Sequence, residues 1–392
     1  MRSTKTGMRE QRRALVGSVA GTLLPIGLAV LPLGLVFQNV VPAATSDVLF
    51  VLLVLFSAGT VAAVVRLSPA PVILACLGGA AAAATGRPNI FAISLIPLLA
   101  FTLQHVDIEV LPRRFVRGGL VVIILVVGLY YSTGFNSQFD RTVWRDYSGE
   151  FVFRQAVGFD HPNRAMMTWC AIAVAAMVFA GPRARLIRSG PLFVGTLFMF
   201  AATDSRTSAA LTLGVVFFAT IWRRRIDSAV PPSVRVGAIL APWLATAGAF
   251  GLATLATNQW VSTVLTGRPA IYASLLETYP ILTLFGTESV EGLSVDNGYL
   301  QMILGKGPIL TVVYLSTLSI ILALPKRLSL RTLLVLGALL ASALVETTLL
   351  NFAFLFVLLA STEIDRRLWP STLSTPVAGL AVSTPKSQQM TN

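Results

Sequence analysis

The sequence predicts an all-α polytopic integral membrane protein, and three observations lead to that class. Hydrophobic residues make up 55% of the 392 residues and charged residues only 12%, whereas soluble domains carry roughly 25% charged residues. The mean hydropathy is +0.76. Apolar runs recur along the chain, and a run of about 20 residues forms a helix long enough to cross the hydrocarbon core of a bilayer.

About twelve apolar runs qualify as candidate membrane-spanning helices. They cover residues 14–37, 48–65, 70–85, 90–104, 118–135, 165–180, 190–203, 207–222, 236–256, 299–324, 332–346 and 349–361. Together they predict one transmembrane domain over residues 1–369. Residues 370–392 are rich in Ser, Thr and Pro, which is typical of a disordered tail.

The basic residues orient these helices, because Lys and Arg concentrate in the cytoplasmic loops of membrane proteins. With the N-terminus in the cytoplasm, most of the 30 basic residues fall in cytoplasmic segments, and the C-terminal tail is cytoplasmic too. The outer side receives only Arg87, Arg141, Arg145, Arg154, Arg164, Arg206, Arg268 and Lys306. Because the net charge of +13 gathers at the ends of spans, it argues against a nucleic-acid partner.

Two predicted outer loops, at about 136–163 and 257–297, are longer than most connections between helices. In the first loop the sequence FDHPNR precedes a span. Pro162 and Asn163 are typical of a helix start. A simple helix cap explains Pro162 well, but it explains Arg154, His161 and Arg164 less well, since cations at a helix N-terminus oppose its dipole. A bound anion would remove that conflict.

Arg206 lies in the sequence ATDSRTS, between two apolar runs with almost no loop. A charged residue at membrane depth costs roughly 2.5 kcal/mol or more at the bilayer centre and less near the interface. One interpretation is a tight turn in which Asp204 pairs with Arg206 and Ser205 caps the next helix. The other is a cation that lines a polar cavity and binds an anionic group of a ligand.

The second loop contains GRPAIYASLLETYP, where Pro269 fits the first position of a helix. Apolar residues at helical spacing over 270–279 predict a short helix along the membrane surface. Arg268 then lies at the N-terminal edge of that helix. It either faces the site or extends along the surface with its charged end in water.

Four further polar residues lie at the edges of late spans or within them. Asp296 and Asn297 enter the span at 299–324, where helix capping is the simplest role. Lys306 stands between two glycines, which predicts an irregular helix that faces protein or a wet cavity. Glu346 flanks a tight outer turn, and its burial there requires a partner such as an outer arginine.

The order of these motifs is similar to that in a known superfamily. GFDHPN before a span, DSRTS between two spans, GRP at an outer helix and DNGYLQMILGKG before a late span occur in sequence over roughly residues 150–355. The chain resembles the O-antigen polymerases and O-antigen ligases, which are membrane glycosyltransferases acting on polyprenyl-diphosphate-linked glycans. Asn297 and Gly307 keep the spacing of the ligase motif, but Asp296 stands where ligases have His, which favours a polymerase.

The resemblance implies a polysaccharide repeat-unit polymerase on the outer face of the bacterial cytoplasmic membrane. Arg206 and Arg268 would bind the donor diphosphate, and Asp296 would accept or orient the proton of the acceptor hydroxyl. The residues expected to bind substrate are His161, Asn163, Arg164, Arg154, Asn297, Tyr299, Lys306 and Glu346. No cofactor or metal ion is implied. The partners would be a polyprenyl-diphosphate-linked oligosaccharide, the lipid bilayer, a flippase and a chain-length regulator.

Three alternatives stay open. A ligase would move finished glycan to a different acceptor. A transporter or flippase of polysaccharide or lipid-linked glycan would also suit about twelve spans, although transporters hold their ionisable groups near the midplane of the membrane. A structural membrane subunit is the fourth possibility, and the outer arginines argue against it.

Overall fold

The computed structural model describes residues 69–369, except 86–87, 105–107, 109, 146–148, 266, 280–282, 285, 288–289, 291–295 and 347–348. The spans predicted at 14–37 and 48–65 and the tail at 370–392 lie outside the described residues, as do parts of the second outer loop.

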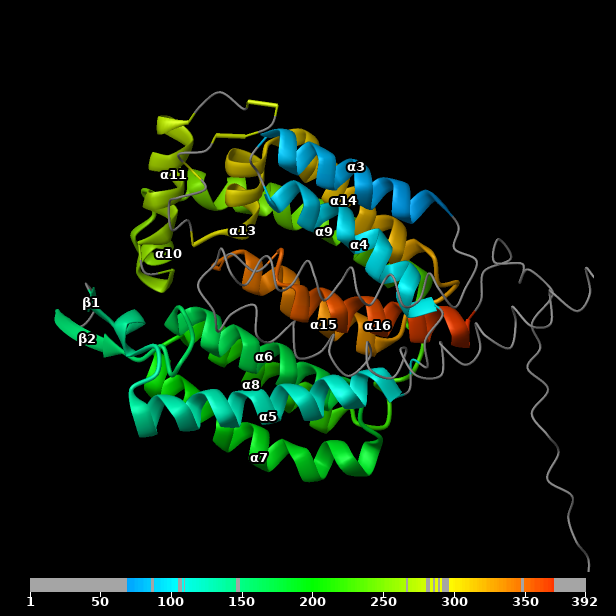
Figure 1. The fold of residues 1–392 in the computed structure, drawn as a ribbon, viewed down its shortest axis with the longest axis horizontal. Coiled ribbons are helices and arrows are strands. Elements are labelled where there is room, and N and C mark those ends of the chain that lie inside the picture. The colour runs from blue at the N-terminus through cyan, green and yellow to red at the C-terminus, as the bar shows by residue number, and fades with distance from the viewer. Residues whose placement is uncertain are drawn as a thin grey trace, which may run out of the picture.

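The described chain is mainly helical (Figure 1). Its helices are α3 (Pro69–Thr85), α4 (Pro88–Gln104), α5 (Val110–Thr133), α6 (Pro162–Val178), α7 (Pro182–Thr203), α8 (Arg206–Ile221), α9 (Pro232–Thr254), α10 (Gln259–Val264), α11 (Arg268–Thr278), α13 (Gly298–Leu300), α14 (Pro308–Ala323), α15 (Leu330–Ala343) and α16 (Phe352–Leu368). A helix lies in each predicted range from 70–85 to 349–361.

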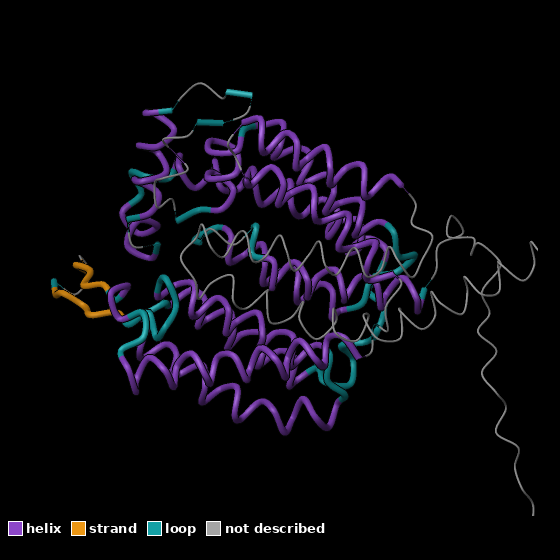
Figure 2. The backbone as a smooth tube through the Cα atoms, viewed as in Figure 1, coloured by secondary structure: helices purple, strands orange, loops and turns teal. Residues whose placement is uncertain are grey.

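Among the described helices, three are long and apolar enough to cross a membrane, namely α5, α7 and α9. The apolar helices α8, α14 and α15 are shorter. Neighbouring long and short helices run side by side in the bundle (Figure 2). Length and composition therefore define a helical membrane protein, while the full number of spans remains a prediction.

The two helices at the centre of the bundle are α6 and α16. Every residue from Ala165 to Val178 in α6 and from Phe352 to Glu363 in α16 is buried. The helices around them instead expose large apolar side chains, among them Ile124, Val194 and Leu244. Soluble monomers rarely expose apolar surface on several neighbouring helices, so this surface suits contact with lipid.

The span predicted at 299–324 is not one regular helix. After α13 the chain forms a π-helical segment, Gln301–Lys306, and Gly307 then adopts φ 90° before α14 begins. Thr287 donates its backbone N–H to the Leu304 carbonyl at 2.9 Å. A Cβ on Gly286 would lie 2.2 Å from the Gly305 carbonyl oxygen, so a glycine is needed for this close approach. The irregular helix predicted around Lys306 is confirmed.

The all-α prediction is wrong in the first outer loop. Residues Arg141–Arg145 (β1) and Glu150–Arg154 (β2) form an antiparallel hairpin, with Arg141 opposite Arg154 and Trp144 opposite Phe151. Its sequences RTVWR and EFVFR are rich in β-branched and aromatic residues, which favour strands. The hairpin projects from the end of the bundle that also carries α10 and α11 (Figure 1).

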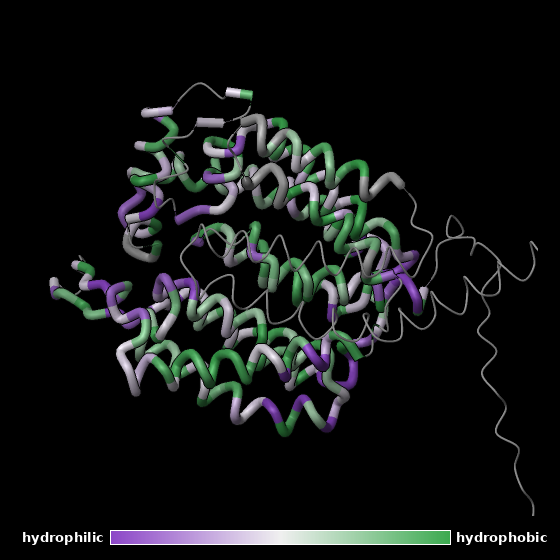
Figure 3. The backbone as a smooth tube through the Cα atoms, in the orientation of Figure 1, coloured by the Kyte–Doolittle hydropathy of each residue, from purple (hydrophilic) through white to green (hydrophobic). Residues whose placement is uncertain are grey.

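The opposite end of the bundle is held together by charges. Asp227, which follows α8, pairs with Arg185 in α7 at 3.1 Å and with Arg331 in α15. The Arg185 side chain is 1% exposed and also donates to the carbonyl of Met177 at 3.0 Å. Some arginines that the sequence analysis assigned only to orienting the chain therefore also join helices. Hydrophilic segments gather at both ends of the bundle (Figure 3).

Replacing Asp227 by Asn should lower the stability of the protein, because it leaves two mostly buried guanidinium groups with less compensating charge. A loss of about 1–3 kcal/mol is expected, measured as a lower midpoint of thermal unfolding in detergent. Asp204→Asn is the matched control, since its partner Arg206 is half-exposed and an exposed pair contributes about 0–1 kcal/mol. Equal losses in the two variants would contradict this account.

Candidate functional site

Five polar side chains from four distant parts of the chain meet at the hairpin end of the bundle. They are Arg154 at the end of β2, Asn163 at the start of α6, Arg268 at the start of α11, Asp296 just before α13 and Glu346 just after α15. We call these five residues the charge cluster. It brings together a predicted catalytic pair, Arg268 and Asp296, with three residues predicted to bind substrate.

Hydrogen bonds connect one side of the charge cluster to the backbone. Arg154 donates through Nε to the Thr203 carbonyl at 2.7 Å and through Nη2 to Asn163 Oδ1. Asn163 in turn donates through Nδ2 to Glu346 Oε2 at 2.8 Å. Since the amide of Asn163 has both its oxygen and its nitrogen engaged, its orientation is fixed, and the carboxylate of Glu346 is held with it.

Arg268 lies on the other side, between two carboxylates. Its Nη2 is 3.8 Å from Asp296 Oδ2 and 4.0 Å from Glu346 Oε1. Both separations exceed hydrogen-bond distance, so these are electrostatic contacts. The side chain of Asp296 is 42% exposed and that of Glu346 only 7%. Asp296 therefore faces solvent, whereas Glu346 forms the inner wall of the charge cluster.

Backbone contacts hold the two carboxylate-bearing segments together. The Tyr272 hydroxyl donates to the carbonyls of Asp296 at 2.7 Å and Leu344 at 3.1 Å. Asn297 Nδ2 donates to the same Leu344 carbonyl at 3.1 Å. A Cβ on Gly298 would lie 3.1 Å from the Glu346 carbonyl oxygen, so the start of α13 packs tightly on the turn after α15.

Tyr272 is a residue that the sequence analysis missed. It is fully buried in α11, one helical turn after Arg268. Residues four apart share a helix face, and that spacing from Arg268 was the available signal. Asn297 caps α13 by accepting from the backbone N–H groups of Tyr299 and Leu300 at 3.0 Å. The capping role is thus confirmed for Asn297, while Asp296 faces Arg268.

Burial raises the pKa of Glu346 to about 7. The negative charge of Asp296 raises this pKa further, whereas Arg268, Arg154 and the hydrogen bond from Asn163 lower it. Desolvation therefore outweighs the cations around this carboxylate. A group with a pKa near neutrality can take up and release protons under physiological conditions.

Arg206, the third residue predicted to be catalytic, is not one of the five and lies at the start of α8, just after α7 ends at Thr203. Its Nε is 3.4 Å from Asp204 Oδ1, and its side chain is 49% exposed. The pairing with Asp204 that the sequence indicated is confirmed. Ser205 makes no side-chain hydrogen bond as a cap. The end of α7, just before the turn to α8, contacts the end of β2 and the residue after it. The Thr203 carbonyl accepts a hydrogen bond from Arg154, and the Ala202 carbonyl accepts one from the Gln155 N–H at 2.8 Å.

His161 and Arg164 stand at the start of α6. His161 caps the helix, with Nδ1 accepting from the Asn163 N–H at 3.0 Å. Burial, aided by nearby arginines, lowers the pKa of His161 to about 4, so the ring is neutral at pH 7. Arg164 pairs with Asp160 one turn away. The predicted helix start is confirmed. The cap from His161 and the pairing of Arg164 with Asp160 account for these residues by contacts within the protein.

Tyr299 and Lys306, both predicted to bind substrate, are buried side chains. Tyr299 is fully buried, and its hydroxyl donates to the Leu340 carbonyl at 3.1 Å. Lys306 ends the π-helical segment and is buried as well. Tyr299 thus connects α13 to α15 and supports the segment from which Asp296 projects.

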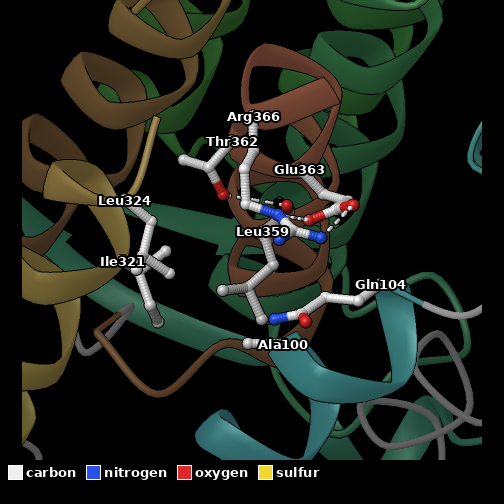
Figure 4. Close-up of a pocket in the computed structure, with 8 residues that line it drawn as sticks. All are labelled: Ala100, Gln104, Ile321, Leu324, Leu359, Thr362, Glu363 and Arg366. Atoms are coloured by element: carbon white, nitrogen blue, oxygen red, sulfur yellow. Dashed lines mark hydrogen bonds and ion pairs between the residues drawn. The ribbon is translucent and has the colours of Figure 1, made fainter. Parts of the chain in front are cut away.

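A small pocket lies at the opposite end of the bundle, between α4, α14 and α16 (Figure 4). Its carboxylate, Glu363, is held by Arg366 at 2.7 Å and Arg367 at 2.8 Å. Arg367 also donates to the Leu103 carbonyl at 3.2 Å. The two arginines compensate the charge of the buried Glu363 carboxylate. This pocket is separate from the charge cluster.

No protein-family model matches the chain, and no curated protein or solved structure matches it. The function proposed below therefore depends on the chemistry of the chain's own residues and on the order of its motifs.

The low pKa of His161 predicts a pH dependence of stability. Below pH 6.5, the ordinary pKa of the group, the unfolded chain gains a proton that the folded protein does not take up until about pH 4. Folding is therefore penalised as the pH falls through that window, by about 1–2 kcal/mol at pH 5. His161→Asn keeps a good helix cap and removes the titrating group.

Acidification from pH 7.5 to pH 5 should thus lower the thermal unfolding midpoint of the wild type more than that of His161→Asn. All other titrating groups are shared, so the difference isolates His161. A shift of the same size in both proteins would show that His161 is protonated as readily in the folded state as in the unfolded chain.

Proposed function

We propose that the protein is a polysaccharide repeat-unit polymerase on the outer face of a bacterial cytoplasmic membrane. It would transfer a polyprenyl-diphosphate-linked glycan to a hydroxyl group of an acceptor sugar. The order of the four sequence motifs supports this proposal. So does the meeting of their residues at one end of a helical membrane protein, where a lipid-linked substrate and a water-soluble glycan chain would be in reach together.

The observation that carries the proposal is the position of Arg268. Its guanidinium group lies between two carboxylates at 3.8 and 4.0 Å, too far for hydrogen bonds to either. A phosphate oxygen could therefore engage its N–H groups without breaking a hydrogen bond to either carboxylate. Arginine is suited to this role because its planar fork of donors matches phosphate geometry.

The reaction we propose is a single displacement at the anomeric carbon of the donor glycan. The acceptor oxygen forms the new bond to that carbon as the bond to the diphosphate oxygen breaks. Polyprenyl diphosphate leaves with the electron pair, and its negative charge is stabilised by Arg268 and Arg206. The acceptor proton passes to a carboxylate of the charge cluster, for which the family resemblance indicates Asp296. The anomeric configuration is inverted.

The remaining predicted residues would support this reaction in different ways. Arg154 and Asn163 would position the carboxylates, whereas Arg164 and Lys306 would add positive potential for the diphosphate. His161, Asn297 and Tyr299 would maintain the helix starts on which the site is built. A flippase would deliver the donor to the outer face, and a chain-length regulator would act on the product.

Replacing Arg268 or Arg206 by Ala should abolish chain extension while the protein still reaches the membrane. Loss of a donor to developing charge typically costs 10²–10³-fold in rate. Polymer and lipid-linked repeat units would be resolved by gel electrophoresis of cell extracts. Arg224→Ala, at the opposite end of the bundle, is the control and should leave polymer length unchanged. Long polymer in both site variants would refute the proposal.

The same extracts distinguish the second candidate, a ligase, which the spacing from Asn297 to Gly307 favours. A polymerase variant accumulates single lipid-linked repeat units, whereas a ligase variant accumulates long lipid-linked polymer. An inactive variant of a transporter would instead leave the substrate on the cytoplasmic side of the membrane, where it is protected from enzymes added outside.

A further inference from the structure

The charge cluster contains two carboxylates that differ in their surroundings, and the proposed reaction needs only one proton acceptor. We propose that Glu346, rather than Asp296, accepts the proton of the acceptor hydroxyl, and that Asn163 and Arg154 are the positioning residues that hold it. This inference rests on the proposed polymerase function and assigns the proton transfer within that site.

Orientation distinguishes the two carboxylates. Glu346 Oε2 accepts the 2.8 Å hydrogen bond from Asn163, which leaves Oε1 directed at Arg268. The backbone around it is fixed too, because Tyr272 and Asn297 both donate to the Leu344 carbonyl. Asp296 is 42% exposed. A general base acts from a defined position within hydrogen-bond reach of the proton, and the hydrogen bond from Asn163 holds the buried Glu346 in such a position.

A chain of hydrogen bonds connects Glu346 to the backbone of α7. Asn163 donates to Glu346, Arg154 donates to Asn163, and Arg154 also donates to the carbonyl of Thr203 at the end of α7. Asn163 is itself fixed at the start of α6, where its N–H donates to His161 Nδ1. Positioning residues of this kind hold a reactive group in its productive geometry.

Donor binding would make Glu346 a stronger base. Among the described residues, those that face it are Asp296, Arg268, Arg154 and Asn163. Burial raises the pKa of Glu346 to about 7, and Arg268 opposes that rise. A diphosphate bound to Arg268 neutralises that cation and adds negative charge nearby, so the pKa rises further. Proton affinity thus increases when the donor is in place, which links proton removal to the presence of the leaving group.

The proton balance of the step follows from this arrangement. The acceptor O–H bond breaks as its oxygen bonds to the anomeric carbon, and the proton passes to Glu346 Oε1. The leaving polyprenyl diphosphate takes the electron pair of the broken carbon–oxygen bond. Glu346 then returns its proton to water through the exposed side of the charge cluster, where Asp296 lies.

The test uses purified full-length protein and lipid-linked glycan extracted from cells in which the gene is deleted, since those cells would accumulate the substrate. Glu346→Gln keeps an oxygen that accepts from Asn163 but cannot take a proton. It should lower the polymerisation rate at least about 100-fold. Undecaprenyl diphosphate should bind at least as tightly as to the wild type, because a negative charge next to Arg268 is removed. Asp296→Asn should lower the rate less than about tenfold.

A pH profile separates proton transfer from a purely structural effect. The wild-type rate should fall as the pH drops through about 7, the pKa of Glu346. In Asn163→Ala this acidic limb should move to higher pH, because the hydrogen bond that lowers the pKa is lost. This variant also tests the proposal if Glu346→Gln does not fold.

Two outcomes would overturn the inference while leaving the polymerase function intact. One is an active wild type in which Glu346→Gln retains its rate and Asp296→Asn loses it. The other is an acidic limb that does not move in Asn163→Ala. A folded wild type that makes no polymer from the extracted glycan would overturn the polymerase function as well.

Discussion

The hydrogen bond from Asn163 to Glu346 is the interaction on which the arrangement of the candidate site depends. It joins residues 183 positions apart at 2.8 Å, and so connects the start of α6 to the turn after α15. Burying a carboxylate is costly unless hydrogen bonds or cations compensate it. Here one amide and two arginines compensate Glu346. Those requirements bring the hairpin, α6, α11 and α15 together at one end of the bundle.

The two ends of the protein use charge differently. At one end Asp227 forms short contacts with Arg185 and Arg331, and the buried carboxylate Glu363 holds Arg366 and Arg367. These oppositely charged groups lie within hydrogen-bond distance of one another. In the charge cluster Arg268 stays near 4 Å from both of its carboxylates, and the Asp296 side chain is 42% exposed. Close ion pairs hold one end of the bundle together, whereas a cation without close hydrogen bonds to its carboxylates can exchange them for an anionic ligand.

The sequence was most informative where local physics decides structure. Apolar runs located the helices between 70 and 361. Pro162 and Pro269 located the starts of α6 and α11, and the glycines around Lys306 indicated a broken helix. The hairpin was missed although RTVWR and EFVFR contain residues that favour strands, because two strands of five residues give only a short pattern. The contacts of Glu346 could not be predicted, since neither Arg154 nor Asn163 is near it in sequence. A partner for Glu346 was expected, but its identity depends on how distant helices pack.

We propose that the charge cluster binds the diphosphate of a lipid-linked donor, and a direct binding measurement tests this proposal. The dissociation constant of undecaprenyl diphosphate would be measured for wild type, Arg268→Gln and Arg224→Gln in lipid nanodiscs. Binding should be at least about tenfold weaker in Arg268→Gln, equivalent to about 1.4 kcal/mol, and unchanged in Arg224→Gln. Equal dissociation constants for wild type and Arg268→Gln would contradict it.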